Sequence, residues 1–240
     1  MARHKKSGNN GVTIEWITHI VASSLNAVPR AAQTIDTIGS IVGFRRWSKT
    51  LGVRVYATRV KLWEQMILPK LLVSTSPVSI FEFGVAYGEA SRWWLSKLSS
   101  QTLKYGGFDL FTGLPTAWRN MPAGAFNANG QTPQIDDERV TWFVGDVGET
   151  VKDIDWNQHL GQRLFIFDLD LFSPSLAVWE VIQEKLKPGD LLYFDEAFDI
   201  DERLLLQTYI LPSNRFKPLG SSPFGIVLQC NEARQKSDIS

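Results

Sequence analysis

Leu164-Phe-Ile-Phe-Asp-Leu-Asp-Leu171 is a short apolar run that ends in two aspartates, and Asp190-Leu-Leu-Tyr-Phe-Asp-Glu196 repeats the pattern with an acidic pair. Apolar runs of this length are typical of parallel strands that are buried on both faces. The segment between them has the length of a crossover helix, so the two runs predict a strand-helix-strand unit. Ligands bind beyond the carboxyl ends of such strands, where both acidic groups would lie.

The same alternation of short apolar runs with helix-length segments fills the chain after Pro77. Two final runs, 215–219 and 225–230, flank a Gly-Ser-Ser-Pro turn and predict an antiparallel hairpin. The expected fold class is therefore α/β and Rossmann-like, with a seven-stranded, mostly parallel sheet. We expect strands at 78–84, 105–110, 140–145, 164–171 and 190–195, and helices at 88–99, 174–186 and 199–206.

The N-terminal part has the period of helices rather than of strands. Residues 12–28 place Ile14, Ile17, Ile20, Val21 and Leu25 at helical spacing, which predicts an amphipathic helix. Helical periodicity continues to residue 68, where Pro69 follows. We expect residues 1–72 to form a tail and helical extension that serves as a lid or a dimerisation segment. The α/β domain would then comprise residues 73–240.

Composition excludes several classes of protein. A chain of 240 residues with 44% hydrophobic residues can bury a large core in one or two domains. Basic and acidic residues number 25 each, so no net charge attracts nucleic acid or acidic membranes. No apolar run reaches the roughly 18 residues of a membrane span. The single cysteine, Cys230, excludes an intramolecular disulfide. We expect a cytoplasmic protein without nucleic-acid or membrane partners.

The two acidic groups predict a metal site. Carboxylates at neighbouring strand ends repel one another unless a cation or a proton lies between them. Hard divalent ions such as Mg²⁺ take oxygen ligands in this arrangement. The alternative is that each carboxylate caps a helix or lies solvated at the end of a loop.

A strand-to-helix turn after the first predicted strand reads Phe81-Glu-Phe-Gly-Val-Ala-Tyr-Gly-Glu-Ala-Ser91. Gly84 and Gly88 would let backbone approach a ligand, and Glu82 supplies an acceptor beside them. A dinucleotide fingerprint has a Gly-x-Gly pair here, whereas three residues separate these glycines. The spacing disfavours an NAD-dependent dehydrogenase. S-adenosylmethionine fits better, because its methionine end meets backbone groups and its ribose needs an acidic partner.

Two further aspartates follow predicted strands. Asp109 comes 25 residues after Gly84, where nucleoside-binding folds place a carboxylate for the ribose hydroxyls. Asp146 is a candidate for the adenine amino group. Each has an alternative as a cap of the segment that follows it. The long segment 111–139, rich in Pro, Gly and Asn, is expected to be a functional lid.

These residues together resemble the macrocin O-methyltransferase family, metal-dependent sugar O-methyltransferases within the class I S-adenosylmethionine-dependent methyltransferases. The matching pieces follow the family's order between residues 78 and 200; they are 82–91, 107–115 with Trp118, 124–126, 167–173, 188–189 and 194–198. The resemblance implies a class I methyltransferase fold. It also implies Mg²⁺-dependent transfer of a methyl group from S-adenosylmethionine to a hydroxyl of a sugar or glycosylated small molecule.

The resemblance also implies roles for individual residues. The metal ligands would be Asp168, Asp195 and Glu196. Some members carry a histidine base three residues after the first ligand, but Leu171 occupies that position, so Asp170 or Asp168 becomes the candidate base. The expected cofactor-binding residues are Glu82, Gly84, Val85, Gly88, Ser91, Asp109 and Asp146.

Aromatic side chains suggest where an acceptor, expected to be a glycoside, would lie. Trp118 with Phe126, and Phe198 with Asp199, are candidates for the acceptor pocket. Apolar N-terminal helices on such a core predict a homodimer or a higher homo-oligomer. Residues expected to have structural or solvated roles instead are Trp93, Trp94, His4, His19 and His159.

Two alternative functions stay open. A catechol-type small-molecule O-methyltransferase would share the sheet and the acidic metal cluster. Such enzymes often carry a lysine near the first metal ligand, and the segment 168–172 has none. A nucleoside-binding protein without catalysis, acting in assembly through its N-terminal helices, would have no physical need for so many unpaired carboxylates.

Overall fold

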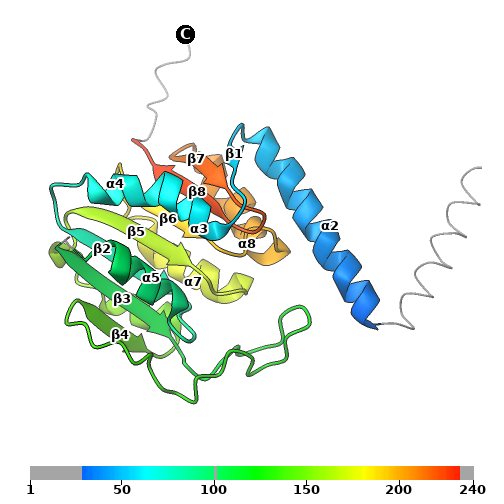
Figure 1. The fold of residues 1–240 in the computed structure, drawn as a ribbon, viewed down its shortest axis with the longest axis horizontal. Coiled ribbons are helices and arrows are strands. Elements are labelled where there is room, and N and C mark those ends of the chain that lie inside the picture. The colour runs from blue at the N-terminus through cyan, green and yellow to red at the C-terminus, as the bar shows by residue number, and fades with distance from the viewer. Residues whose placement is uncertain (1–28, 100–101, 233–240) are drawn as a thin grey trace, which may run out of the picture. The chain divides into compact units, whose positions relative to one another are not determined.

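The computed structural model describes residues 29–99 and 102–232. The helix expected over 12–28, together with His4 and His19, lies outside these residues. The chain divides into two compact units, 1–39 and 40–240. Helix α2 (Pro29–Thr50) begins in the first unit, and the second unit holds every other described element (Figure 1). Residues 40–72 therefore belong to the larger unit, while the role of 1–72 as a lid or dimerisation segment stays a prediction.

One sheet of eight strands forms the centre of the larger unit, with the order β1-β7-β8-β6-β5-β2-β3-β4. Strands β2 to β6 run parallel to one another, whereas β8 runs antiparallel to both β6 and β7. The expected mostly parallel sheet with a C-terminal hairpin is confirmed. The bounds are β1 Arg54–Val55, β2 Val78–Phe83, β3 Leu103–Asp109, β4 Val140–Val144, β5 Gln162–Phe167, β6 Leu191–Phe194, β7 Phe216–Ser221 and β8 Ile226–Cys230.

The expected strand count of seven was one too low. The additional strand, β1, has two residues and pairs in parallel with the edge strand β7, Arg54 opposite Gly220 and Val55 opposite Ser221. Strands are recognised in a sequence by alternation of apolar and polar residues over about four positions or more. Two residues are too few to show this alternation.

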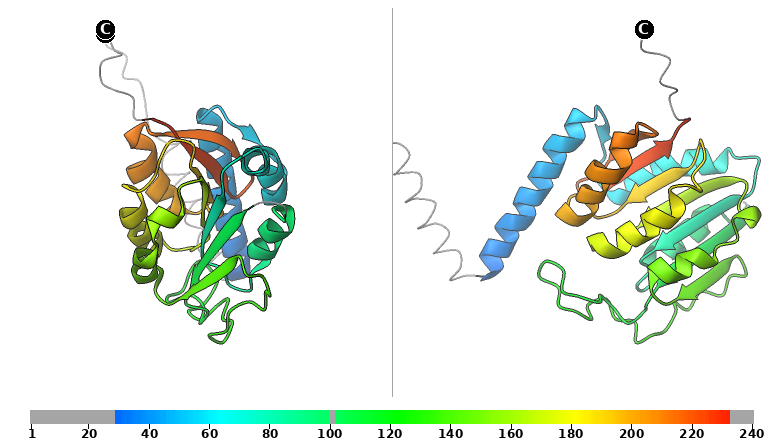
Figure 2. Two further views of the ribbon diagram at one scale, coloured as in Figure 1. Left: turned by 90° about the vertical axis from the view of Figure 1, so that its left-hand side faces the viewer. Right: turned by 180° about the vertical axis from the view of Figure 1, so that it is seen from behind.

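Helices cover both faces of the sheet (Figure 2). One face carries a helical segment that precedes β2, together with α5 (Glu89–Lys97). The preceding segment consists of α3 (Arg59–Leu62), a π-helical turn (Trp63–Ile67) and α4 (Leu68–Leu72). We expected the helical segment to end before Pro69, but it continues through this residue. Pro69 lies in the first turn of α4, where a missing backbone N–H is tolerated.

The opposite face carries α7 (Phe172–Ile182) and α8 (Ile200–Leu205), which continues as a π-helical turn. The short helix α6 (Val147–Thr150) follows β4. Within the described residues, 29–99 and 102–232, no helix combines the length and the apolar character that a membrane span needs.

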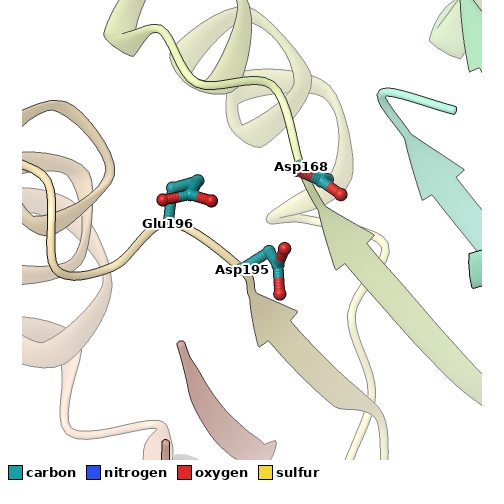
Figure 3. A group of neighbouring side chains, drawn as sticks. All are labelled: Asp168, Asp195 and Glu196. Carbon is teal, nitrogen blue, oxygen red and sulfur yellow. The ribbon is translucent and has the colours of Figure 1, made fainter. Parts of the chain in front are cut away.

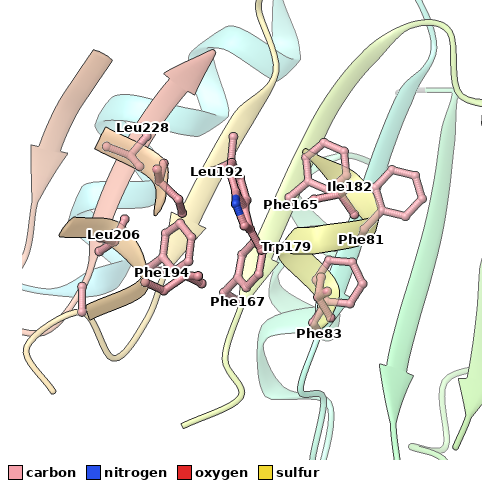
Figure 4. Close-up of a cluster of buried hydrophobic side chains, with 14 of the residues drawn as sticks. Phe81, Phe83, Phe165, Phe167, Trp179, Ile182, Leu192, Phe194, Leu206 and Leu228 are labelled. Carbon is pink, nitrogen blue, oxygen red and sulfur yellow. The ribbon is translucent and has the colours of Figure 1, made fainter. Parts of the chain in front are cut away.

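Alternation along the central strands creates two cores. In β5, Phe165 and Phe167 point to the α7 face, while Leu164 and Ile166 point to the α3 face. On the α7 side, aromatic rings stack across strands, with Phe167 and Phe194 centroids 4.4 Å apart (Figure 4). The same alternation continues just past the carboxyl ends of the strands. It therefore decides which side chains meet at that edge of the sheet.

Candidate active site

A cavity of about 440 Å³ opens at the carboxyl ends of the central parallel strands. This edge is where the strand order reverses, between β2 and β5, and where ligands bind in open α/β sheets. Nine of the eleven predicted site residues line the cavity: Glu82, Gly84, Val85, Asp109, Asp146, Asp168, Asp170, Asp195 and Glu196. The other two, Gly88 and Ser91, are placed differently, as described below.

The acidic cluster lies at the ends of β5 and β6 (Figure 3). Asp168, Asp195 and Glu196 can each offer an oxygen to one point, with these oxygens all within 4.8 Å of one another. Burial, followed by repulsion from Asp195, raises the pKa of Asp168 well above its usual range. The same causes raise the pKa of Glu196 to about 9. Three carboxylates this close, Asp195 buried and the other two partly buried, fit the oxygen-rich ligand set of a hard divalent cation, which would relieve the repulsion.

Asp195 is held by two side chains that the sequence did not point to. Tyr193 donates its hydroxyl hydrogen to Oδ1 of Asp195. Arg59 donates from an amino group to Oδ2, at 2.8 Å. The tyrosine lies two residues before Asp195, so strand alternation could have placed it on the same side of the sheet. No such local signal exists for Arg59, which is 136 residues away in the chain.

Local structure delivers Arg59 to this position. It is the first residue of α3, whose N-cap Thr58 accepts a hydrogen bond from the backbone N–H of Lys61. Its guanidinium lies over the ring of Trp63, 5.4 Å from the ring centroid. The helical segment before β2 therefore forms part of the cavity wall.

A fourth buried acid supports Glu196 from behind. Glu202, in α8, is fully buried and accepts a hydrogen bond from the backbone N–H of Glu196 at 3.1 Å. Its other carboxylate oxygen has no hydrogen-bond partner. Burial and the nearby Glu196 raise its pKa well above the usual range.

Asp170, a candidate base, also lies in the cavity wall. It is 8% exposed and adopts a left-handed backbone conformation with φ of 63°. Burial, then Asp195 and Asp199, raises its pKa to about 7. A carboxyl group with this pKa can accept a proton near neutral pH.

The structure shows why the turn after β2 needs glycines, which the sequence alone did not. Gly84 has φ of 88°, and a Cβ there would lie 1.8 Å from the carbonyl oxygen of Asp168. Glycine is thus required for the close approach of the β5 backbone. Gly88 has φ of 78° at the N-cap of α5, and a Cβ there would lie 2.8 Å from Pro133. A close approach of either glycine to a ligand stays a prediction.

Asp109 organises the turn. Its carboxylate accepts backbone N–H groups from Val85 at 2.7 Å, Ala86 at 2.8 Å and Phe111 at 2.7 Å. Asp146 caps α6 by accepting the N–H of Gly148 at 2.9 Å. Both capping alternatives are therefore realised, although both aspartates also line the cavity. Their contacts with a nucleoside stay predictions.

Glu82 lies buried beneath the turn. It accepts hydrogen bonds from Tyr105 at 2.6 Å and from Ser91. Burial raises its pKa to about 7. Ser91 is fully buried and does not line the cavity, so its hydroxyl supports the cavity through Glu82.

The segment 111–139 folds back on itself and contributes to the cavity. Trp118 and Phe126 line it, as expected for an acceptor pocket. The other expected pair, Phe198 with Asp199, does not line it. Asp199 caps α8 and forms an ion pair with Arg119, whose guanidinium lies 5.1 Å from the Phe198 ring centroid. This pair anchors the segment 111–139 to the start of α8.

The remaining candidates lie away from the cavity. His159 places Nδ1 2.8 Å from Oγ of Ser79 and packs edge-on against Phe81. Trp93 and Trp94 pack against Trp63, with centroids 5.1 and 5.3 Å away. None of these three predicted structural residues, His159, Trp93 or Trp94, lines the cavity.

No protein-family model matches the sequence, and no curated protein matches it significantly. Among solved structures, the calicheamicin methyltransferase CalS11 is similar with a TM-score of 0.51 and 22% identity, over 72% of this chain and 80% of that chain. An apo structure of CalS11, described as a TDP-rhamnose 3′-O-methyltransferase, gives a TM-score of 0.50 and 23% identity, over 72% and 81%. The O-methyltransferase NovP gives 0.55 and 15%, over 69% and 76%. The fold is therefore the Rossmann-like class I methyltransferase fold.

Proposed function

We propose that the protein is an S-adenosylmethionine-dependent, Mg²⁺-dependent O-methyltransferase that acts on a hydroxyl of a sugar or glycosylated small molecule. One observation carries the proposal. The cluster of Asp168, Asp195 and Glu196 and the turn anchored by Asp109 border the same cavity. A cation site and a nucleoside site side by side are what methyl transfer to a weakly acidic hydroxyl requires.

The cofactor supplies an activated methyl group, and a divalent cation held by Asp168, Asp195 and Glu196 would make the acceptor hydroxyl more acidic. The chain's own residues do the remaining work. Tyr193 and Arg59 fix Asp195 through both of its oxygens, and Glu202 fixes the backbone at Glu196. Holding the reactants in line reduces the entropic part of the barrier.

Proton removal falls to Asp170 in this proposal. Its carboxylate takes the acceptor's proton as the new carbon–oxygen bond forms, and the methyl–sulfur bond breaks towards the cofactor. A pKa of about 7 balances the fraction of ionised base against its strength at neutral pH. Asp168 is the alternative base.

Two observations support a glycoside as the acceptor. Trp118 and Phe126 offer aromatic faces to the cavity, and such faces suit sugar rings. CalS11, a structure with the same fold, is described as a TDP-rhamnose methyltransferase. A catechol-type O-methyltransferase remains the alternative, because a catechol also presents two vicinal oxygens. A homodimer and a cytoplasmic location remain predictions.

Calorimetry with S-adenosylhomocysteine, NAD and Mg²⁺ tests the proposal, followed by a methyl-transfer screen of glycosides and catechols. We expect S-adenosylhomocysteine to bind and NAD not to bind. Turnover should require Mg²⁺ and should favour glycosides. A protein that binds no S-adenosylhomocysteine would overturn the proposed function, and turnover of catechols alone would select the alternative.

A further inference from the structure

An ion pair between Arg119 and Asp199 connects the segment 111–139 to the start of α8. The pair is largely buried, since the two side chains are 13% and 6% exposed. The guanidinium also lies over the ring of Phe198, 5.1 Å from the ring centroid. A buried pair is costly to break on one side, because the remaining charge stays away from water. Loss of either side chain should therefore release this part of the segment.

Arg119 occupies a tight turn next to the cavity. Its backbone is left-handed, with φ of 51°, a conformation that residues other than glycine rarely adopt. Two backbone hydrogen bonds between Trp118 and Met121, at 3.0 and 2.7 Å, close the turn. Such a conformation persists where the surrounding structure holds it, and here the ion pair with Asp199 does so. Because Trp118 lines the cavity, the pair also fixes one wall of the proposed acceptor pocket.

Asp199 is connected in turn to the candidate metal ligand Glu196. The backbone N–H of Asp199 donates to the carbonyl oxygen of Glu196 at 2.8 Å. In a capping box, Glu202 would bind that N–H, since it occupies the N3 position after the N-cap Asp199. Glu202 is fully buried and instead accepts the N–H of Glu196 at 3.1 Å. Both backbone polar groups of Glu196 are thus held by residues at the start of α8.

We propose that Arg119 is a positioning residue for Glu196, and that the Arg119–Asp199 pair couples the segment 111–139 to the candidate metal site. This rests on the proposed function, since the cation site is itself part of it. The pair fixes the start of α8 and, with it, the backbone of Glu196. A cation that needs Glu196 in this position binds more tightly when the segment is in place. By linkage, the cation stabilises the segment by the same factor, so the metal site and the acceptor pocket form together.

The experiment measures Mn²⁺ affinity by electron paramagnetic resonance in four full-length proteins. These are the wild type, Arg119→Gln, the double variant Arg119→Gln/Asp199→Asn, and Arg54→Gln. Asparagine is a good N-cap, so the double variant keeps the start of α8. It removes one charge of each sign and leaves the net charge unchanged. Arg54 is an exposed arginine that stacks on Tyr56 outside the cavity, so Arg54→Gln controls for loss of a positive charge.

Charge and positioning predict opposite results for Arg119→Gln. Loss of a positive charge beside Asp199 would by itself strengthen Mn²⁺ binding. We expect instead that Arg119→Gln and the double variant bind Mn²⁺ about 5- to 50-fold more weakly than the wild type, with Arg54→Gln unchanged. A misfolded fraction would lower the number of ions bound per chain without changing the dissociation constant. Mn²⁺ binding by Arg119→Gln that is as tight as in the wild type, or tighter, would overturn the inference.

Hydrogen exchange gives the reciprocal measurement on the segment itself. In the wild type, saturating Mn²⁺ should slow exchange of the Trp118 and Met121 amides about 5- to 50-fold, the same factor by linkage. Arg119→Gln should lose this dependence. Exchange in the wild type that does not respond to bound Mn²⁺ would contradict the coupling and leave the metal site intact. A wild type that binds no Mn²⁺ would instead reject the metal part of the proposed function.

Discussion

Asp109 and Asp168 both lie at the carboxyl ends of strands in the same sheet, yet their surroundings differ. Asp109, at the end of β3, accepts three backbone N–H groups at 2.7–2.8 Å. Asp168, just after β5, is surrounded by carboxylates, and burial with that repulsion raises its pKa well above the usual range. The half of the cavity that we propose binds the nucleoside is thus stabilised by the protein's own amides, whereas the acidic half still requires a cation or protons.

The largest expected effect follows from removing a cation from the acidic half. Chelation, or the substitution Asp168→Ala, should lower methyl transfer by at least about 10³-fold, because the acceptor hydroxyl would keep its high pKa. Binding of S-adenosylhomocysteine should change little, because its proposed nucleoside contacts lie at other strand ends. Added Mg²⁺ or Mn²⁺ should restore the chelated wild type.

Asp195 provides a graded version of this test. Asp195→Asn keeps one oxygen and should recover partly at high Mg²⁺, whereas Asp195→Ala should resist recovery. Equal recovery of both variants would argue that Asp195 is not a ligand. Steady-state rates across a Mg²⁺ titration provide the measurement.

The next largest effect concerns the base. Asp170→Asn should lower turnover by about 10²- to 10³-fold while leaving Mn²⁺ affinity nearly unchanged. In the wild type the rate should rise with pH as Asp170 deprotonates, because only the deprotonated carboxylate accepts a proton. The midpoint should lie below the pKa of about 7 in the metal-free protein, because a bound cation relieves the repulsion from Asp195. The variant should lose this rise. If the variant retains the wild-type pH profile, Asp170 is not the base and Asp168 becomes the candidate.

In the nucleoside half, Asp109→Ala should weaken S-adenosylhomocysteine by about 10- to 100-fold, through loss of the ribose partner and of the three N–H contacts. Asp109→Asn keeps one acceptor oxygen for the turn and should lose less. Calorimetry with both variants measures the difference. Unchanged affinity in Asp109→Ala would remove this residue from the cofactor site.

The smallest expected effect is the pH dependence of stability. In the folded, metal-free protein the pKa values of Glu82 and Asp170 are about 7 and that of Glu196 is about 9, all above their values in an unfolded chain. The folded state therefore binds more protons between about pH 5 and 9, and its stability falls as pH rises through this window. The free energy of unfolding should fall between pH 6 and 8.5, by about 1.4 kcal/mol for each pH unit over which one of these groups is protonated in the folded state alone.

Thermal unfolding with and without Mg²⁺ measures this dependence. Mg²⁺ should stabilise the protein more at pH 8.5 than at pH 6, because the ion binds ionised carboxylates. Stability that rises with pH in the metal-free protein would contradict the assigned shifts.

The same two regions indicate what the sequence could predict. The sheet, its hairpin and the meeting of both acidic groups follow from local alternation, since the carboxyl ends of parallel strands share one edge. Strand β1 was missed because two residues carry no pattern. Gly84 was recognised as a necessary glycine, but its reason, the Asp168 carbonyl 1.8 Å from a would-be Cβ, depends on the pairing of β2 with β5.

Arg59 marks the limit of the sequence-based interpretation. Its contact with Asp195 depends on how the helical segment before β2, which contains Arg59, packs against the sheet. No sequence pattern near either residue predicts that packing. The Arg119–Asp199 pair is likewise a contact between a loop and a helix start. Phe198 and Asp199 were therefore assigned to the acceptor pocket, although they anchor the segment 111–139 instead.

The central claim is that Asp168, Asp195 and Glu196 form one divalent-cation site. Electron paramagnetic resonance of Mn²⁺ titrated into verified metal-free protein at pH 8 tests it most directly. We predict one bound Mn²⁺ per chain in the wild type, its loss in the double variant Asp168→Asn/Asp195→Asn, and its retention in Asp109→Ala. Equal Mn²⁺ binding by the wild type and the double variant, or none by either, would contradict the account.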